Sequence, residues 1–274
     1  MDKGYKTAIN IPDAHVPWNC VASFKIILNI IKDVSNKYGL DELNLLGDFL
    51  DYYHVGLHPK MPSHFSIKQT FKDEIYLGNK ALDKLRDTAP EADFRYIEGN
   101  HEQRLMRYLT KNAPELFDFV STQQLLNLDS RHITYYPYGK KQLVPCLGST
   151  DYILRHRPFS EGKHTAISTV DKKKISLGYG HTHRKQLVTC TDALGKELVG
   201  RSLGWIGDKF APVFDYMDTD DWSKGIEFVI TFGDTLIKNY IDIHHDIKTN
   251  QVVAWFEGFF YCEPYESPYD GYIV

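Results

Sequence analysis

Apolar positions in the first half of the chain follow two spacings in turn. Short apolar runs that end in polar turns predict strands, and longer segments with apolar residues three or four apart predict helices. The order strand, helix, strand is typical of βαβ units with parallel strands. The predicted strands are 5–15, 42–51 and 93–100, and the predicted helices are 21–39, 66–90 and 101–114.

The second half has a different pattern, in which short runs typical of strands dominate. Turn signals at 193–195 and 233–234 predict two hairpins. Because no linker separates the halves, we expect a single domain over 1–274, with 184–274 mostly strands that complete a second sheet. The strand-rich segments are 131–137, 151–157, 174–181, 186–202, 225–243 and 252–261.

Composition narrows the class of protein without assigning a function. The chain has 274 residues, is 42% hydrophobic and carries a formal net charge of −4, so it can bury a large core and has no broadly basic character. Nucleic acid remains possible as a partner, because bound metal ions would add local positive charge. The sequence has no apolar leader and no membrane-length apolar run, and no feature indicates a protein partner. We therefore expect a cytoplasmic protein, with scattered reduced thiols at Cys20, Cys146, Cys190 and Cys262.

Four polar segments share one form, an apolar strand followed by a turn with His, Asp or Asn. Loops at the strand ends of an α/β sheet converge on one crevice, so we expect these side chains to meet. Side chains two apart on an extended strand point the same way, which would bring the members of each Asp-x-His or His-x-His pair together. The segments are Asp13-Ala14-His15, Gly47-Asp48-Phe49-Leu50-Asp51, Gly99-Asn100-His101-Glu102 and Gly180-His181-Thr182-His183.

The side chains in these segments predict a metal centre. Carboxylates, imidazoles and one amide, with no thiolate, suit Mn, Fe or Zn better than a structural sulfur site. There are too many ligands for one ion. Two ions about 3.5–4 Å apart, bridged by a carboxylate, would use them all.

The series Asp-x-His, GDxxD, GNHE, a later His and GHTH resembles the calcineurin-like metallophosphoesterase superfamily, especially its phage and bacterial members. The resemblance spans residues 13–183. It implies an α/β fold, a four-layer α/β/β/α sandwich of two mixed sheets flanked by helices. It also implies an enzyme that hydrolyses phosphate mono- or diesters by a metal-bound hydroxide. The alternatives are a DNA or RNA phosphodiesterase of the same superfamily and, less favoured, a catalytically silent scaffold.

The resemblance also implies roles for single residues. One ion would be held by three of the ligands and the other ion by three more, with Asp48 bridging both. His101 would face the substrate and stabilise the transition state or protonate the leaving oxygen, and Asp51 would orient the His101 imidazole. Mn²⁺ is the favoured ion, with Fe, Zn or Ni as alternatives. The two ligand sets are Asp13, His15 and His183, and Asn100, His156 and His181.

The later His of the pattern has three candidates. We favour His156, which ends an apolar strand as the other ligands do, over His164 in a Gly-Lys-His loop and His132 at the start of a strand. The family usually has His-Gly here, whereas this chain has His156-Arg157.

Other positions near the motifs have weaker predicted roles. Tyr52 stands where protein Ser/Thr phosphatases of the superfamily have a phosphate-gripping Arg, which disfavours a phosphoprotein substrate. Arg157 and Arg184 flank the late ligands and are candidates for substrate binding. We expect Glu102 to be a first-turn helix carboxylate that faces the helix dipole.

Overall fold

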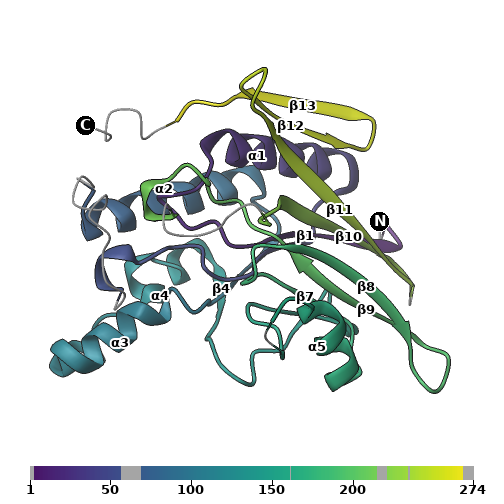
Figure 1. Cartoon of the computed structure of the whole chain (residues 1–274), viewed down its shortest axis with the longest axis horizontal. Coiled ribbons are helices and arrows are strands. Elements are labelled where there is room, and N and C mark those ends of the chain that lie inside the picture. The colour runs from purple at the N-terminus through teal and green to yellow at the C-terminus, as the bar shows by residue number, and fades with distance from the viewer. Residues whose placement is uncertain (1–2, 57–68, 161, 215–220, 234, 268–274) are drawn as a thin grey trace.

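The protein consists of two stacked mixed sheets with helices on their outer faces (Figure 1). The computed structural model describes residues 3–56, 69–160, 162–214, 221–233 and 235–267. This arrangement confirms the predicted fold class. The strands of the first sheet, in spatial order, are β13 (Phe259–Pro264), β12 (Gln251–Phe256), β11 (Thr235–Asp246), β10 (Lys224–Phe232), β1 (Tyr5–Ile11), β2 (Glu42–Leu45), β3 (Asp93–Ile97) and β4 (Ile133–Tyr136).

The second sheet is smaller and lies across the first. Its spatial order is β5 (Val144–Cys146), β6 (Ser149–Arg155), β7 (Leu177–Tyr179), β9 (Glu197–Leu203) and β8 (Lys185–Thr191). Buried apolar side chains of both sheets form a common core, with Ala8, Leu46 and Ile97 from one side and Tyr152 and Leu154 from the other. The sheets therefore bury their facing sides against each other.

Helices cover the two outer faces, as Figure 1 shows. α1 (Val21–Tyr38) packs against β12 and β13, and α2 (Phe71–Thr88) packs against α1. α2 begins with a capping box, in which the Thr70 and Asp73 side chains each accept from the other residue's backbone N–H. α3 (Gln103–Asn112) and the short α4 (Thr122–Leu125) follow.

The pattern of the first half predicted the parallel strands correctly. β1 pairs in parallel with β2, β2 with β3, and β3 with β4. Their carboxyl ends therefore lie along one edge of the first sheet. The turns that leave this edge carry the polar motifs.

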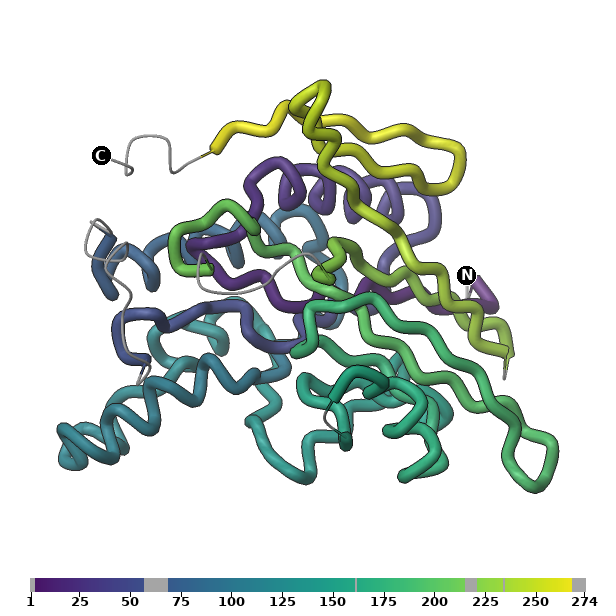
Figure 2. The backbone as a smooth tube through the Cα atoms, viewed as in Figure 1, coloured from purple at the N-terminus to yellow at the C-terminus, as the bar shows by residue number. Residues whose placement is uncertain are grey.

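Two features of the second half differ from the expectation. α5 (Thr165–Lys173), which covers β8 and β9, was not predicted, because its segment is polar and only a narrow strip including Ala166 and Val170 is buried. Of the strands described in 184–274, only β8 and β9 complete the second sheet. β10 to β13 extend the first sheet instead, because β10 pairs with β1 (Figure 2).

Among the described residues, no helix is long and apolar enough to cross a membrane.

Candidate metal centre

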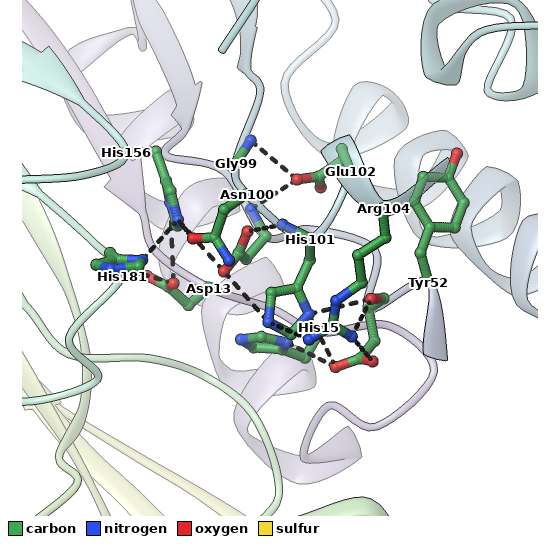
Figure 3. Close-up of polar contacts among 12 residues, drawn as sticks. Asp13, His15, Tyr52, Gly99, Asn100, His101, Glu102, Arg104, His156 and His181 are labelled. Atoms are coloured by element: carbon green, nitrogen blue, oxygen red, sulfur yellow. Dashed lines mark hydrogen bonds and ion pairs between the residues drawn. The ribbon is translucent and has the colours of Figure 1, made fainter. Parts of the chain in front are cut away.

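The polar motifs converge at the carboxyl ends of five strands. β1 leads to Asp13 and His15, β2 to Asp48, and β3 to Asn100 and His101. The second sheet supplies the rest of the cluster, in which side chains from both sheets point toward one another (Figure 3). The residues that follow its strands β6 and β7 are His156, His181 and His183.

The backbone around these side chains is tightly curled. Asp13, His15, Asp48, His181 and His183 all have positive φ, between 32° and 69°. Few non-glycine residues adopt this region, and such residues concentrate at functional sites. The expectation of extended Asp-x-His and His-x-His pairs was therefore wrong, because turns bring these side chains together.

Two glycines allow the turns to touch. A Cβ at Gly99 would overlap the backbone N and carboxylate of Asp48. A Cβ at Gly180 would overlap the Asp13 carboxylate, which accepts hydrogen bonds of 2.9 Å from the His181 backbone N–H. These motif glycines are required for close approach of one segment to another.

One group of possible ligands centres on two imidazoles. His15 Nε2 lies 3.0 Å from His183 Nε2, and His183 Nε2 lies 3.5 Å from Asp13 Oδ1. Together with Asp48, these residues offer four ligand atoms within 4.8 Å of one another, all from buried side chains.

A second group adjoins the first. His156 Nε2 lies 2.9 Å from Asn100 Oδ1, 3.3 Å from Asp48 Oδ2 and 3.3 Å from His181 Nδ1. Asp48, His156 and His181 form a second cluster of possible ligand atoms within 4.8 Å. Asp48 is thus common to both groups.

The donor set fits metal ions. His15 Nδ1–H donates to Asp51 Oδ2 at 2.9 Å, and His156 Nδ1–H donates to the Leu46 carbonyl at 2.8 Å. Each bond occupies Nδ1, so Nε2 is the ring atom that faces the cluster, as in metal-binding histidines. Ligand atoms on one ion, with bonds of about 2.0–2.1 Å, lie roughly 3 Å apart, which is the spacing seen between His15 and His183.

The protonation states of three imidazoles also suit cations. Burial lowers the pKa of His15 to about 4, and burial lowers the pKa values of His181 and His183 to about 3. These imidazoles are therefore neutral ligands at neutral pH. Burial opposes charge on His156 and Asp48, but their mutual attraction dominates, so the pKa of His156 rises to about 9 and that of Asp48 falls well below its usual range.

Asp51 contacts two imidazoles. Its carboxylate accepts from His15, as above, and lies 3.3 Å from His101 Nδ1. His101 Nδ1–H also donates to the Asp51 carbonyl at 3.0 Å, and the His101 backbone N–H donates to Asp48 Oδ1 at 2.8 Å. Asp51 therefore contacts both His15 and His101.

Glu102 does not act as a first-turn helix carboxylate, so that prediction was wrong. Its fully buried side chain reaches back to the turn of Asp48. Its carboxylate accepts five hydrogen bonds, from the backbone N–H groups of Asp48, Phe49, Leu50 and Gly99 and from the Tyr96 hydroxyl, at 2.8–3.1 Å. No local signal points to this role, because three of its partners lie more than fifty residues earlier.

The remaining candidate residues lie outside the two groups of possible ligands. His132 and His164 are exposed and take no part in it. Arg157 lies close enough to His181 to help lower its pKa, after the larger effects of burial, His156 and His183. Arg184 follows His183 directly and pairs with Asp221 at 3.5 Å.

Sequence reasoning gave no role to Arg104, which contacts the centre. Its guanidinium donates to Asp51 and to His101 Nε2, each at 2.9 Å. The three-residue spacing from His101 on a predicted helix is a signal that could have found it.

Comparisons with known proteins give distant similarities. No family model matches the chain. The Gene 54 protein of Mycobacterium phage L5 is 25% identical over 234 residues, 83% of this chain and 90% of the relative. The Gene 54 protein of Mycobacterium phage D29 is 25% identical over 183 residues, 66% of this chain and 70% of the relative.

Solved structures are similar at lower identity. Vps29 of Chaetomium thermophilum is 13% identical with a TM-score of 0.44, covering 96% of this chain and 98% of its own. The nuclease MPE of Pseudomonas putida is 13% identical with a TM-score of 0.34, covering 85% and 86%. At these values, function has to be derived from the site itself. In its fold class and in the clustering of its motif residues, the chain resembles the calcineurin-like metallophosphoesterases.

Proposed function

We propose that the chain is a calcineurin-like, binuclear metal-dependent phosphoesterase that hydrolyses phosphate mono- or diesters. The observation that supports this most strongly is the position of Asp48, whose carboxylate belongs to two adjacent clusters of buried imidazole and carboxylate groups. A carboxylate shared in this way is suited to bridge two cations.

The first ion would be held by one set of ligands and the second by the other, with Asp48 between them. Two Mn²⁺ ions are the favoured occupants, since the ligands are oxygen and imidazole nitrogen without thiolate. When bound, the ions neutralise phosphate oxygens and lower the pKa of a water so that it can act as the nucleophile. The sets are Asp13, His15 and His183 for one ion, and Asn100, His156 and His181 for the other.

His101 is the proposed catalytic side chain. It adjoins both clusters, and its side chain retains 15% exposure, whereas the Asp48 side chain is 2% exposed. Burial lowers its pKa, but Asp48 and Asp51 outweigh this, so the pKa of His101 is raised. A protonated imidazole beside the substrate can stabilise developing charge or donate a proton to the leaving oxygen.

Asp51 is proposed to assist as a positioning residue. It holds the Nδ1 side of both His15 and His101, so that the Nε2 atoms of both rings are turned away from it. A carboxylate behind a ligand imidazole raises ligand basicity and fixes the ring.

A panel of substrates tests the proposal. Mn²⁺-loaded protein should hydrolyse p-nitrophenyl phosphate, its bis ester or both, and EDTA should abolish the activity. Single- and double-stranded DNA in the same panel tests the nuclease alternative, and Arg157 and Arg184 are the candidate contacts for its backbone. Hydrolysis of none of these substrates, with metal bound, would instead support a silent scaffold.

A further inference from the structure

Arg104 contacts both His101 and Asp51. It lies one helical turn after His101, and its backbone N–H donates to the His101 carbonyl at 2.8 Å. Its Nη1 donates to the Asp51 carbonyl and to Asp51 Oδ1, both at 2.9 Å. Its Nη2 donates to His101 Nε2 at 2.9 Å (Figure 3). One guanidinium therefore spans Asp51 and His101.

The contact with His101 is of a kind that a substrate can replace. A guanidinium is a permanent cation that only donates hydrogen bonds. Its planar fork matches the oxygens of phosphate better than it matches a single ring nitrogen. The two Nη1 hydrogen bonds to Asp51 anchor the side chain, so Nη2 can change partner without loss of its position.

The residue that follows Asp51 cannot supply this cation. Tyr52 is fully buried, and its hydroxyl lies 3.2 Å from Thr122 Oγ1, on the side away from the cluster (Figure 3). Among the residues described, it is the permanently charged Arg104 side chain that donates hydrogen bonds to His101 and to Asp51.

We infer that Arg104 binds a nonbridging oxygen of the substrate's phosphoryl group, its Nη2 moving from His101 Nε2 to that oxygen. The inference rests on the proposed function and extends it by one substrate-binding residue. Transfer of Nη2 to the phosphoryl group also frees the lone pair of His101 Nε2, which can then take up a proton from solvent and donate it to the leaving oxygen. Substrate binding and the availability of His101 are thereby coupled through one side chain.

Binding of inorganic phosphate to Mn²⁺-loaded protein, measured by calorimetry, tests the inference apart from turnover. Arg104→Met should weaken phosphate binding at least tenfold and lower kcat/KM by about 10²–10³, mainly through KM. Arg104→Lys should recover part of the loss, because it retains charge without the fork. Arg107→Met, an exposed change on the same helix, is the matched control and should behave as the wild type.

Manganese content is measured for every variant. If Arg104→Met loses manganese, Arg104→Gln, which keeps a donor for Asp51, replaces it under the same expectation. Unchanged phosphate affinity in a metal-loaded variant, with lower turnover, would overturn the inference and leave Arg104 as a positioning residue. A wild-type protein that binds manganese but hydrolyses no phosphoester would overturn the proposed function instead.

Discussion

The carboxylate of Glu102 accepts a hydrogen bond from the backbone N–H of Asp48, at 3.1 Å between Oε2 and N. It accepts from Phe49 and Leu50 as well, at 2.8 and 3.1 Å. Glu102, the residue just before α3, is thereby hydrogen-bonded to the turn that carries Asp48, the proposed bridging ligand. The two oxygens of the Glu102 carboxylate together accept five hydrogen bonds, so all of their lone pairs are in use.

Glu102→Gln should therefore weaken the metal site without altering any ligand. The amide replaces an acceptor with a donor and leaves at least one buried N–H unpaired, which costs about 1–3 kcal/mol of stability. Loss of such a support typically lowers metal affinity about 10–100-fold. Manganese titration and thermal unfolding measure both effects. Glu115→Gln, an exposed change, is the control, and equal manganese affinity in the two variants would contradict the role of Glu102.

His101→Ala separates catalysis from metal binding. His101 contributes no atom to the two proposed ligand sets, so the variant should bind manganese as the wild type does. Turnover should fall about 10²–10⁴-fold, the usual contribution of a general acid or base. Full activity in this variant would show that another group serves the leaving oxygen.

Glu74 predicts a pH dependence of stability. This α2 side chain is buried; Oε1 accepts from the Tyr52 backbone N–H, and Oε2 has no hydrogen-bond partner among the described residues. Burial, and secondarily the Asp51 charge, raise its pKa well above the usual value of 4.5. An acid with a raised folded pKa takes up a proton on folding, so its contribution is fully favourable below the unfolded pKa and is lost as pH rises through the folded pKa.

Glu74→Gln removes this titration and keeps an acceptor for Tyr52. Its unfolding temperature should fall less than that of the wild type as pH rises from 5 to 8. Thermal unfolding at a series of pH values checks this. Parallel curves for variant and wild type would show that Glu74 does not titrate differently in the two states.

The sequence predicted the helices at the start of the chain and the motif residues at strand ends, because apolar spacing and motif order are local signals. It assigned β10 to β13 to the second sheet, whereas they belong to the first. Their sheet is decided by pairing of β10 with β1, in which Tyr5 lies opposite Phe232. Glu102 was missed for a similar reason, since its partners Asp48, Phe49 and Leu50 are distant in sequence. The contact of Arg104 with Asp51 is equally distant, and only its three-residue spacing from His101 is a local signal.

If the active centre needs two bound ions, turnover should depend on the occupancy of both sites, and a titration of turnover against added Mn²⁺ tests this most directly. Metal-free protein at a concentration well above the dissociation constants receives increasing equivalents of Mn²⁺, and the rate with the better p-nitrophenyl substrate is followed. We predict that the rate rises to a plateau at two equivalents per chain. A plateau at one equivalent, or no turnover at any ratio, would contradict the binuclear phosphoesterase.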